Sequence, residues 1–207
     1  MRTLLAILLA AAAPAMKHTA ADTTLAKASL VKVADFGKGW TGKAGPQVGV
    51  VLGCTGFRPS GKGIVETGAA SSPAISHGTV GPFVLQKTSV YATTAEANTY
   101  WQRAVTPHLT TCVAGVLQGV AARGVKVTIT KQGTLPFSTS LAHTAAYRVV
   151  GLLGPHKYKN YVDVIVLGRG RMLTVIEITS FQQPPTSLEK GLAAIVPARM
   201  NGGPGAA

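Results

Sequence analysis

Residues 145–181 read AAYRVVGLLGPHKYKNYVDVIVLGRGRMLTVIEITSF, and this stretch decides the fold. It holds three runs rich in β-branched and other apolar residues, at 145–153, 161–167 and 172–181. Gly154-Pro155 separates the first two runs, and Gly-Arg-Gly-Arg at 168–171 separates the last two. Such short Gly-containing segments are typical of hairpin turns. The stretch therefore predicts strands that pair as an antiparallel meander.

Further strands are expected on the N-terminal side of this stretch. Residues 125–130 alternate apolar and polar side chains, which predicts one more strand of the meander. Residues 64–68 and 84–91 also have the composition of strands, and the second of them alternates. The sequence therefore predicts an antiparallel sheet of about five to six strands.

Helices are expected in the middle and at the end of the chain. Two T-x-x-E sequences, at 93–96 and 186–189, have the form of a capping box, in which the Thr hydroxyl accepts from the amide of the Glu. The first precedes an apolar stripe of helical spacing that includes Cys112, and the second precedes a closing helix. Because the strands are grouped between these helices, we predict an α+β fold with helices on one face of the sheet.

Residues 1–21 have the features of a secretory signal peptide. A basic residue precedes an uninterrupted apolar run at 4–13, which is too short to span a bilayer as a helix. Small-x-small sequences predict cleavage after Ala15 or after Ala21, and a buried N-terminal helix is the alternative. The first cysteine of the chain is Cys54, so no lipobox cysteine follows the signal. We therefore expect a secreted protein rather than a lipid-anchored one.

The rest of the chain is predicted to be a single α+β domain over 22–200 and a flexible Gly-rich tail over 201–207. No second apolar stretch is long enough to predict a transmembrane segment. The two cysteines, Cys54 and Cys112, are expected to form one disulfide, as an even pair in an exported chain most often does. The bond would pin an irregular loop, predicted over 44–64, to the helix of Cys112.

The chain is strongly basic, with a net charge of +13 at pH 7. Such a charge attracts anionic polymers and surfaces, and a basic isoelectric point that only keeps the protein soluble is the alternative. The densest basic positions are candidates for a basic surface: Lys157, Lys159, Arg169 and Arg171. No aromatic residues interleave with them as a base-stacking platform requires, so a nucleic-acid partner is not expected.

Motifs for catalysis and for cofactors are weak. Gly56 to Lys62 fits G-x-x-x-x-G-K, but Gly63 stands where a P-loop has Ser or Thr, and a strand is predicted to follow instead of a helix. The five histidines share no spacing of a metal site, and the chain has no G-x-S-x-G elbow. We therefore expect no cofactor, no metal ion and no catalytic site.

Charged residues inside the predicted strands need a separate explanation. Arg148 and Asp163 stand in two neighbouring strands of the meander, and Glu177 stands in the third. Charges in otherwise apolar strands are usually paired, because an unpaired buried charge is costly. We favour an Arg148–Asp163 ion pair that braces the sheet over a charge that binds a ligand.

Five features carry a resemblance to known proteins: Ala-Asp-Phe-Gly-Lys-Gly-Trp at 34–40, Cys-Thr-Gly-Phe-Arg-Pro at 54–59, Tyr-Ala-Thr-Thr-Ala-Glu-Ala at 91–97, the predicted helix that holds Cys112, and the segment 161–171. Together they resemble a family of uncharacterised exported proteins and lipoproteins of actinobacteria. They are also distantly similar to the extracellular sensor domain of mycobacterial receptor kinases of the PknH type. That sensor domain has two disulfides, whereas this chain can form one. The resemblance implies a helix-and-sheet domain with a ligand-binding cleft, and it carries over no catalytic residue.

The sequence therefore predicts a secreted, non-catalytic, sensor-like domain that binds a small molecule or a component of the cell envelope. We expect the cleft between the sheet and the 44–64 loop. The alternatives are an unrecognised extracellular hydrolase and a basic protein held electrostatically to an anionic cell wall. A deep apolar pocket favours the binding domain, a His near a carboxylate in a cleft favours the hydrolase, and a flat basic face favours the wall protein.

Overall fold

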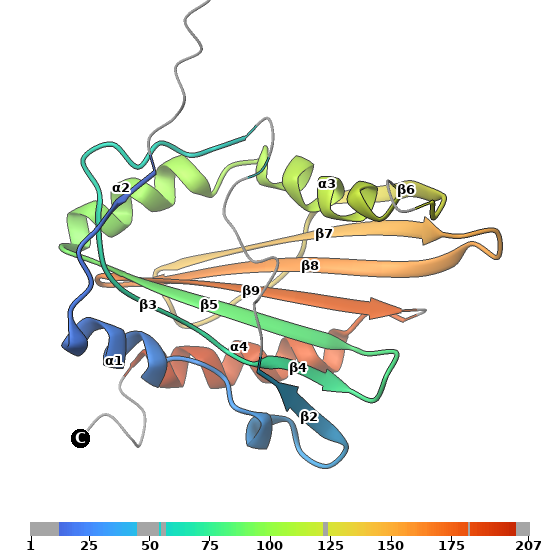
Figure 1. Cartoon of the computed structure of the whole chain (residues 1–207), viewed down its shortest axis with the longest axis horizontal. Coiled ribbons are helices and arrows are strands. Elements are labelled where there is room, and N and C mark those ends of the chain that lie inside the picture. Colours follow the sequence, from blue (N-terminus) through green and yellow to red (C-terminus); the bar gives the residue numbers. More distant parts are fainter. Residues whose placement is uncertain (1–12, 45–53, 55–56, 122–123, 182, 202–207) are drawn as a thin grey trace, which may run out of the picture.

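The computed structural model of this protein describes residues 13–44, 54, 57–121, 124–181 and 183–201. Within these ranges the chain forms a mixed α+β fold with a nine-stranded sheet and four α-helices (Figure 1). The predicted α+β class is thus confirmed. Most of the predicted signal peptide, most of the 44–64 loop and nearly all of the C-terminal tail lie outside the described residues.

The stretch at 145–181 forms the middle of the sheet. Its three runs become β7 (His143–Leu153), β8 (Tyr158–Arg169) and β9 (Met172–Phe181), and each strand is antiparallel to the next. β6 (Val127–Thr134) pairs with the outer side of β7, while β5 (Phe83–Tyr91) pairs with β9. The predicted meander is therefore confirmed, and β9 joins it to the N-terminal half of the sheet.

The sheet is larger than the five to six strands that we predicted. β3 (Val65–Ser71) pairs with β5, and three short strands complete the sheet: β1 (Ala15–Met16), β2 (Trp40–Lys43) and β4 (Ala74–His77). All described pairings between these strands are antiparallel except that of β1 with β3. The three short strands have four residues or fewer, which is too short for alternation to reveal a strand in the sequence.

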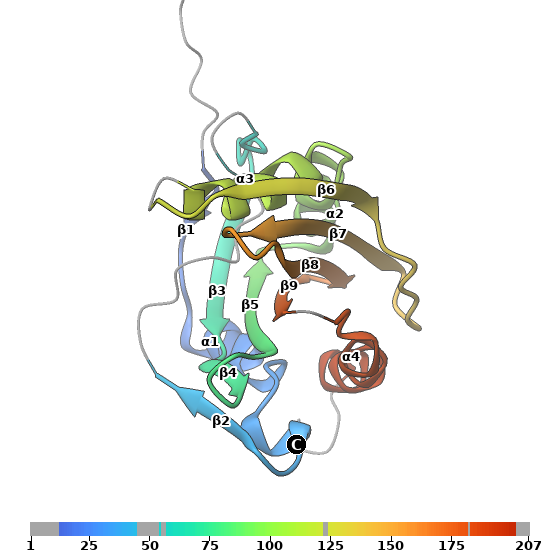
Figure 2. The ribbon, with the colours of Figure 1, turned by 90° about the vertical axis from the view of Figure 1, so that its right-hand side faces the viewer.

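Helices cover both faces of the sheet, so the prediction of one covered face is wrong. α1 (Ala20–Ala28) and α4 (Thr186–Met200) lie on one side, and α2 (Thr94–Ala104) and α3 (Leu109–Ala121) lie on the other (Figures 1 and 2). The chain order did not reveal this arrangement, because α1 and α4, which share one face, come from opposite ends of the described chain.

The alternating residues of β8 give the physical reason for the two covered faces. Ile165 and Leu167 belong to a core cluster that includes Leu192 of α4. Their neighbours Val164 and Val166 belong to a second cluster, together with apolar residues of α3. A strand that is apolar at successive positions exposes apolar surface on both faces, and each face needs its own helical layer.

Only one of the two predicted capping boxes forms a cap. The Thr93 hydroxyl accepts from the backbone N–H of Glu96 at 3.1 Å, and α2 begins at the next residue, as predicted. The second prediction is wrong, because the residue before α4 is Pro185, whose side chain offers no cap. Glu189, expected to complete that box, binds the guanidinium of Arg148 instead.

The predicted disulfide between Cys54 and Cys112 is present. The two Cα atoms lie 5.3 Å apart and the cysteines are 58 positions apart in the sequence. Cys112 is buried in the core cluster beneath α3, and Phe57 packs against the same cluster. The bond therefore ties the segment around Cys54 to α3, on the face of the sheet opposite α4.

The described residues before Asp22 are part of the fold. Thr19 caps α1 by accepting from the backbone N–H of Asp22 at 3.1 Å, and Nε2 of His18 lies 2.9 Å from a carboxylate oxygen of Glu66. Met16 pairs with the edge of β3. The two predicted cleavage sites thus differ in what they leave in place: cleavage after Ala15 keeps these contacts, and cleavage after Ala21 removes them.

A chain that begins at Met16 is expected to be more stable than one that begins at Asp22 by about 1 kcal/mol or more, the usual contribution of a helix N-cap. Urea unfolding of the two chains measures this difference, and N-terminal sequencing of the exported protein shows which of them the cell makes. If both chains unfold at the same urea concentration and with the same dependence of the unfolding free energy on urea, the Thr19 cap and the β1 pairing contribute nothing to stability.

None of the helices in the described ranges has the length and apolar character needed to cross a membrane.

Candidate ligand-binding pocket

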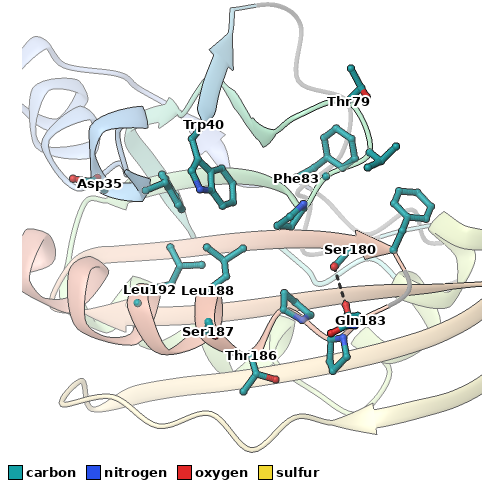
Figure 3. Close-up of a pocket in the computed structure, with 18 of the residues that line it drawn as sticks. Asp35, Trp40, Thr79, Phe83, Ser180, Gln183, Thr186, Ser187, Leu188 and Leu192 are labelled. Carbon is teal, nitrogen blue, oxygen red and sulfur yellow. Dashed lines mark hydrogen bonds between the residues drawn. The ribbon is translucent and has the colours of Figure 1, made fainter. Parts of the chain in front are cut away.

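The main pocket lies at the end of the sheet where β9 ends and β5 begins. Its volume is about 1100 Å³. Four walls enclose it: the 3-10 helix η1 (Val33–Phe36) with the start of β2, the turn between β4 and β5, the end of β9, and the first half of α4. Figure 3 shows Trp40 on one side of this space, facing Leu188 and Leu192 of α4 on the other.

Aromatic rings line the pocket from two sides. Phe36 and Trp40 lie with their ring centres 4.7 Å apart on the wall formed by η1 and β2. Phe83 and Phe181 meet edge to face, with ring centres 6.5 Å apart, where β5 begins and β9 ends. Such rings supply large apolar surfaces of fixed shape. The two pairs therefore make rigid apolar walls.

The wall from α4 is aliphatic and has one open position. Leu188, Leu192 and Ile195 recur at helical spacing and line the pocket. Gly191 lines it as well, and a Cβ atom at this position would meet no other atom within 4 Å. Pro184 ends the chain segment after β9, and α4 starts two residues later. The sequence Pro-Pro therefore turns the chain back over the sheet end and places α4 along the pocket.

The turn between β4 and β5 forms the outer lip of the pocket. It contains Val80, of which 72% is exposed, and a cis peptide bond between Gly81 and Pro82. Gly81 has a φ of +90°, a conformation that favours glycine, and its neighbour Phe83 turns back into the pocket. The turn thus presents an exposed valine beside the aromatic wall.

Asp35 is the only residue with a formal charge among the described lining residues, and it is already paired. Its carboxylate accepts from Arg199 at 2.6 Å and from the backbone N–H of Lys32 at 2.6 Å. The Ser180 hydroxyl, also in the lining, donates to the backbone carbonyl of Gln183. The pocket wall therefore offers apolar surface and neutral polar groups, with no free charge from its described lining.

The predicted partners Arg148 and Asp163 lie together, beneath α4 and outside the pocket lining. The guanidinium donates to the Asp163 carboxylate twice, at 2.6 and 2.7 Å, and also to Glu189 of α4. The Asp163 side chain is fully buried. Burial raises the pKa of Asp163 and of Glu189, and the Arg148 charge acts in the opposite direction on both. The cluster fixes the start of α4 to the sheet and so holds one wall of the pocket.

The four residues proposed as a basic surface do not form one surface. Lys157 and Lys159 lie at one end of β8, and Arg169 and Arg171 lie at the other end of this strand, which is 12 residues long. Arg171 is bound to Asp22 at 2.7 Å. Only the first pair lies near the pocket, because Tyr158 between them is part of its lining.

The cleft that the sequence predicted between the sheet and the 44–64 loop stays a prediction, because 45–53 and 55–56 lie outside the described residues. The observed pocket lies elsewhere, and no described residue of that loop is part of its lining. It combines Tyr158 with residues of three separate segments, 35–40, 79–83 and 180–195. One signal was available: the aromatic residues Phe36, Trp40, Phe83 and Phe181 all stand next to turns or strand ends rather than within the central strands.

A metal site receives no support from the described residues, in which no group of three or more His, Cys, Asp and Glu side chains could hold an ion. The comparisons with known proteins add no name: no protein-family model and no curated protein matches the chain.

Proposed function

We propose that this protein is a secreted, non-catalytic binding domain that takes an apolar ligand into the pocket between α4 and the end of the sheet. The observation that carries the proposal is the pocket itself, about 1100 Å³ in volume and lined by aromatic, aliphatic and proline side chains. Small-molecule pockets usually occupy about 300–1000 Å³, so this one is large enough for a lipid-sized molecule. Each methylene group that leaves water for such a site contributes about 0.8 kcal/mol.

The composition of the lining supports binding over hydrolysis. A hydrolytic site needs a base with free hydrogen-bonding capacity that can activate a hydroxyl or a water molecule. Asp35, the only carboxylate in the described lining, is occupied by Arg199 and by the N–H of Lys32, and no histidine is part of that lining. The extracellular hydrolase therefore remains the weaker alternative.

The test uses Gly191, a lining residue at which an added Cβ atom meets no other atom within 4 Å. Nile red, an uncharged dye that fluoresces in apolar surroundings, is expected to bind saturably to the unmodified protein. Gly191→Phe should weaken this binding by about tenfold or more, because the ring occupies the space of the ligand. Fluorescence titration measures both affinities.

Gly115→Phe is the matched control. Gly115 is an exposed position of α3, and a Cβ atom there also meets nothing within 4 Å. Both substitutions replace a helical glycine by phenylalanine and have the same effect on helix propensity. Gly115→Phe should leave dye binding unchanged. Equal binding by both variants, or no saturable binding by the unmodified protein, would contradict the proposed function.

A further inference from the structure

We propose that the ligand of this pocket is an anionic lipid, with its acyl chain in the cavity and its negatively charged head group held by lysines at the rim. This inference rests on the proposed function and deepens it by naming the class of ligand. Three observations carry it: the absence of free charge in the described lining, the gathering of exposed apolar residues at the mouth, and a rim of lysines without acidic partners.

The described lining requires that any charged part of the ligand stay outside the cavity. Asp35 is neutralised by Arg199, and no other described lining residue has a formal charge. A charge moved into apolar surroundings without a partner is strongly destabilised. A ligand that has both a long apolar part and a charge must therefore leave its charged end at the mouth.

The mouth is marked by exposed apolar side chains. The structure has five large apolar residues with high exposure among those it describes, and three of them are lining residues of this pocket: Val80, Tyr158 and Phe181. Their exposed fractions are 72%, 51% and 38%. Exposed apolar residues that gather at one place usually mark a binding site, and a tyrosine suits the boundary between an apolar and a polar region.

The lysines next to these residues have no acidic partner. Lys157 and Lys159 flank the lining residue Tyr158, and both are exposed. Every ion pair among the described residues uses an arginine or a histidine, and none uses a lysine. The positive charge at the rim is therefore available to an external anion.

Acidic residues near the rim do not cancel this charge. The elements that line the pocket hold four carboxylates, Asp35 of η1, Asp163 of β8, Glu177 of β9 and Glu189 of α4. Asp35 is bound by Arg199, and both Asp163 and Glu189 are bound by Arg148. Glu177 stands within β9 and is not a lining residue of the pocket. A lysine has a flexible apolar stem with a charged end, so it can cover apolar surface and still reach a head group in water. An apolar cavity with a positive rim is complementary to an acyl chain with an anionic head.

The experiment compares three lipids with one identical acyl chain: an anionic lysophosphatidylglycerol, a zwitterionic lysophosphatidylcholine and an uncharged monoacylglycerol, each below its micelle concentration. The reporter is Trp40, which lines the pocket and is one of two tryptophans in the chain. Trp101, the other one, stacks on His143 and belongs to the core cluster beneath α3. Trp101→Phe therefore leaves Trp40 as the only tryptophan signal.

The anionic lipid is expected to bind about tenfold or more tightly than the other two, because the rim lysines attract only its net charge. Lys157→Gln and Lys159→Gln together should lower its affinity to that of the uncharged lipid. The control variant changes two exposed lysines elsewhere to glutamine, Lys27 and Lys131, and has the same net charge. It should retain the preference for the anionic lipid.

The outcomes separate this inference from the proposed function. Equal affinities for the three lipids, with loss of all binding in Gly191→Phe, would overturn the anionic ligand and leave the pocket as a binding site. Binding of the anionic lipid that persists in Gly191→Phe and falls equally in both lysine variants would overturn both, because it would show attraction by net charge alone. Tight binding of the anionic lipid that needs both Gly191 and the rim lysines supports both.

Discussion

Replacing Arg148 with methionine is expected to lower the free energy of unfolding by about 3–5 kcal/mol at neutral pH. The guanidinium binds Asp163 through two hydrogen bonds and Glu189 through a third. The Asp163 side chain is 0% exposed and that of Glu189 is 8% exposed. Removal of the arginine leaves two negative charges close together in a site with little access to water, which costs far more than a lost surface contact.

The loss of stability in Arg148→Met should depend on pH, and the pKa values of the two carboxyl groups determine whether it grows or shrinks as pH rises. Burial already raises the pKa of Asp163 and Glu189 in the folded protein, and loss of the guanidinium raises both further. In the unfolded chain these groups titrate near pH 4. A carboxyl with a raised pKa binds protons more strongly when folded, so the stability of the variant falls as pH rises from about 4 through the folded pKa.

Urea unfolding at about pH 4 and about pH 7 tests both parts of this prediction. The free energy of unfolding of the variant should be close to that of the unmodified protein at the lower pH and far below it at the higher pH. Arg171→Met is the control, since it breaks a pair with Asp22 in which the arginine side chain is 38% exposed and removes one hydrogen bond to the Tyr91 carbonyl. Water can reach the Asp22 carboxylate once the partly exposed arginine is gone, so this loss of stability should be smaller than that of Arg148→Met. An equal loss of stability in the two variants, or a loss in Arg148→Met that does not change with pH, would contradict the role proposed for the buried cluster of Arg148, Asp163 and Glu189.

The strands of the second half were predictable because their signal is local. Alternation and β-branched residues mark each run, and the Gly-containing turns between the runs set their antiparallel order. The pairing of β9 with β5 is different in kind, since it joins Met172–Phe181 to Phe83–Tyr91 across half of the chain. No local pattern encodes such a choice. The sequence therefore predicted the strands of the meander, but its predictions of five to six strands and of one covered face were wrong.

Glu189 shows how a local rule can be overridden by a distant partner. Its spacing from Thr186 fits a capping box, which would have directed the carboxylate to the start of its own helix. In the structure the carboxylate binds Arg148 of β7, because the buried guanidinium has hydrogen-bonding capacity left after it binds Asp163. The same kind of distant packing creates the pocket, because α4 places its aliphatic side chains opposite the aromatic residues of η1, β2, β5 and β9.

Removal of the disulfide by changing both Cys54 and Cys112 to alanine is expected to lower the free energy of unfolding by about 4 kcal/mol, the value that the chain-entropy relation gives for a loop of this size. The bond closes a loop of 58 positions, so the unfolded chain gains much freedom when it is lost. For a domain of this length the melting temperature should fall by roughly 10 °C.

The change should reduce stability and leave the pocket intact. Cys112 packs with α3 on one face of the sheet, whereas the pocket lies at the sheet end against α4, and no residue of α3 is among its described lining residues. At a temperature where the double variant is still folded, it should bind Nile red as the unmodified protein does. The intact mass of the exported, unmodified protein should rise by two hydrogens on reduction. Two free thiols in that protein, or an unchanged melting temperature in the variant, would contradict a stabilising disulfide. Weaker dye binding by the folded variant would show that α3 and the pocket are coupled through the sheet.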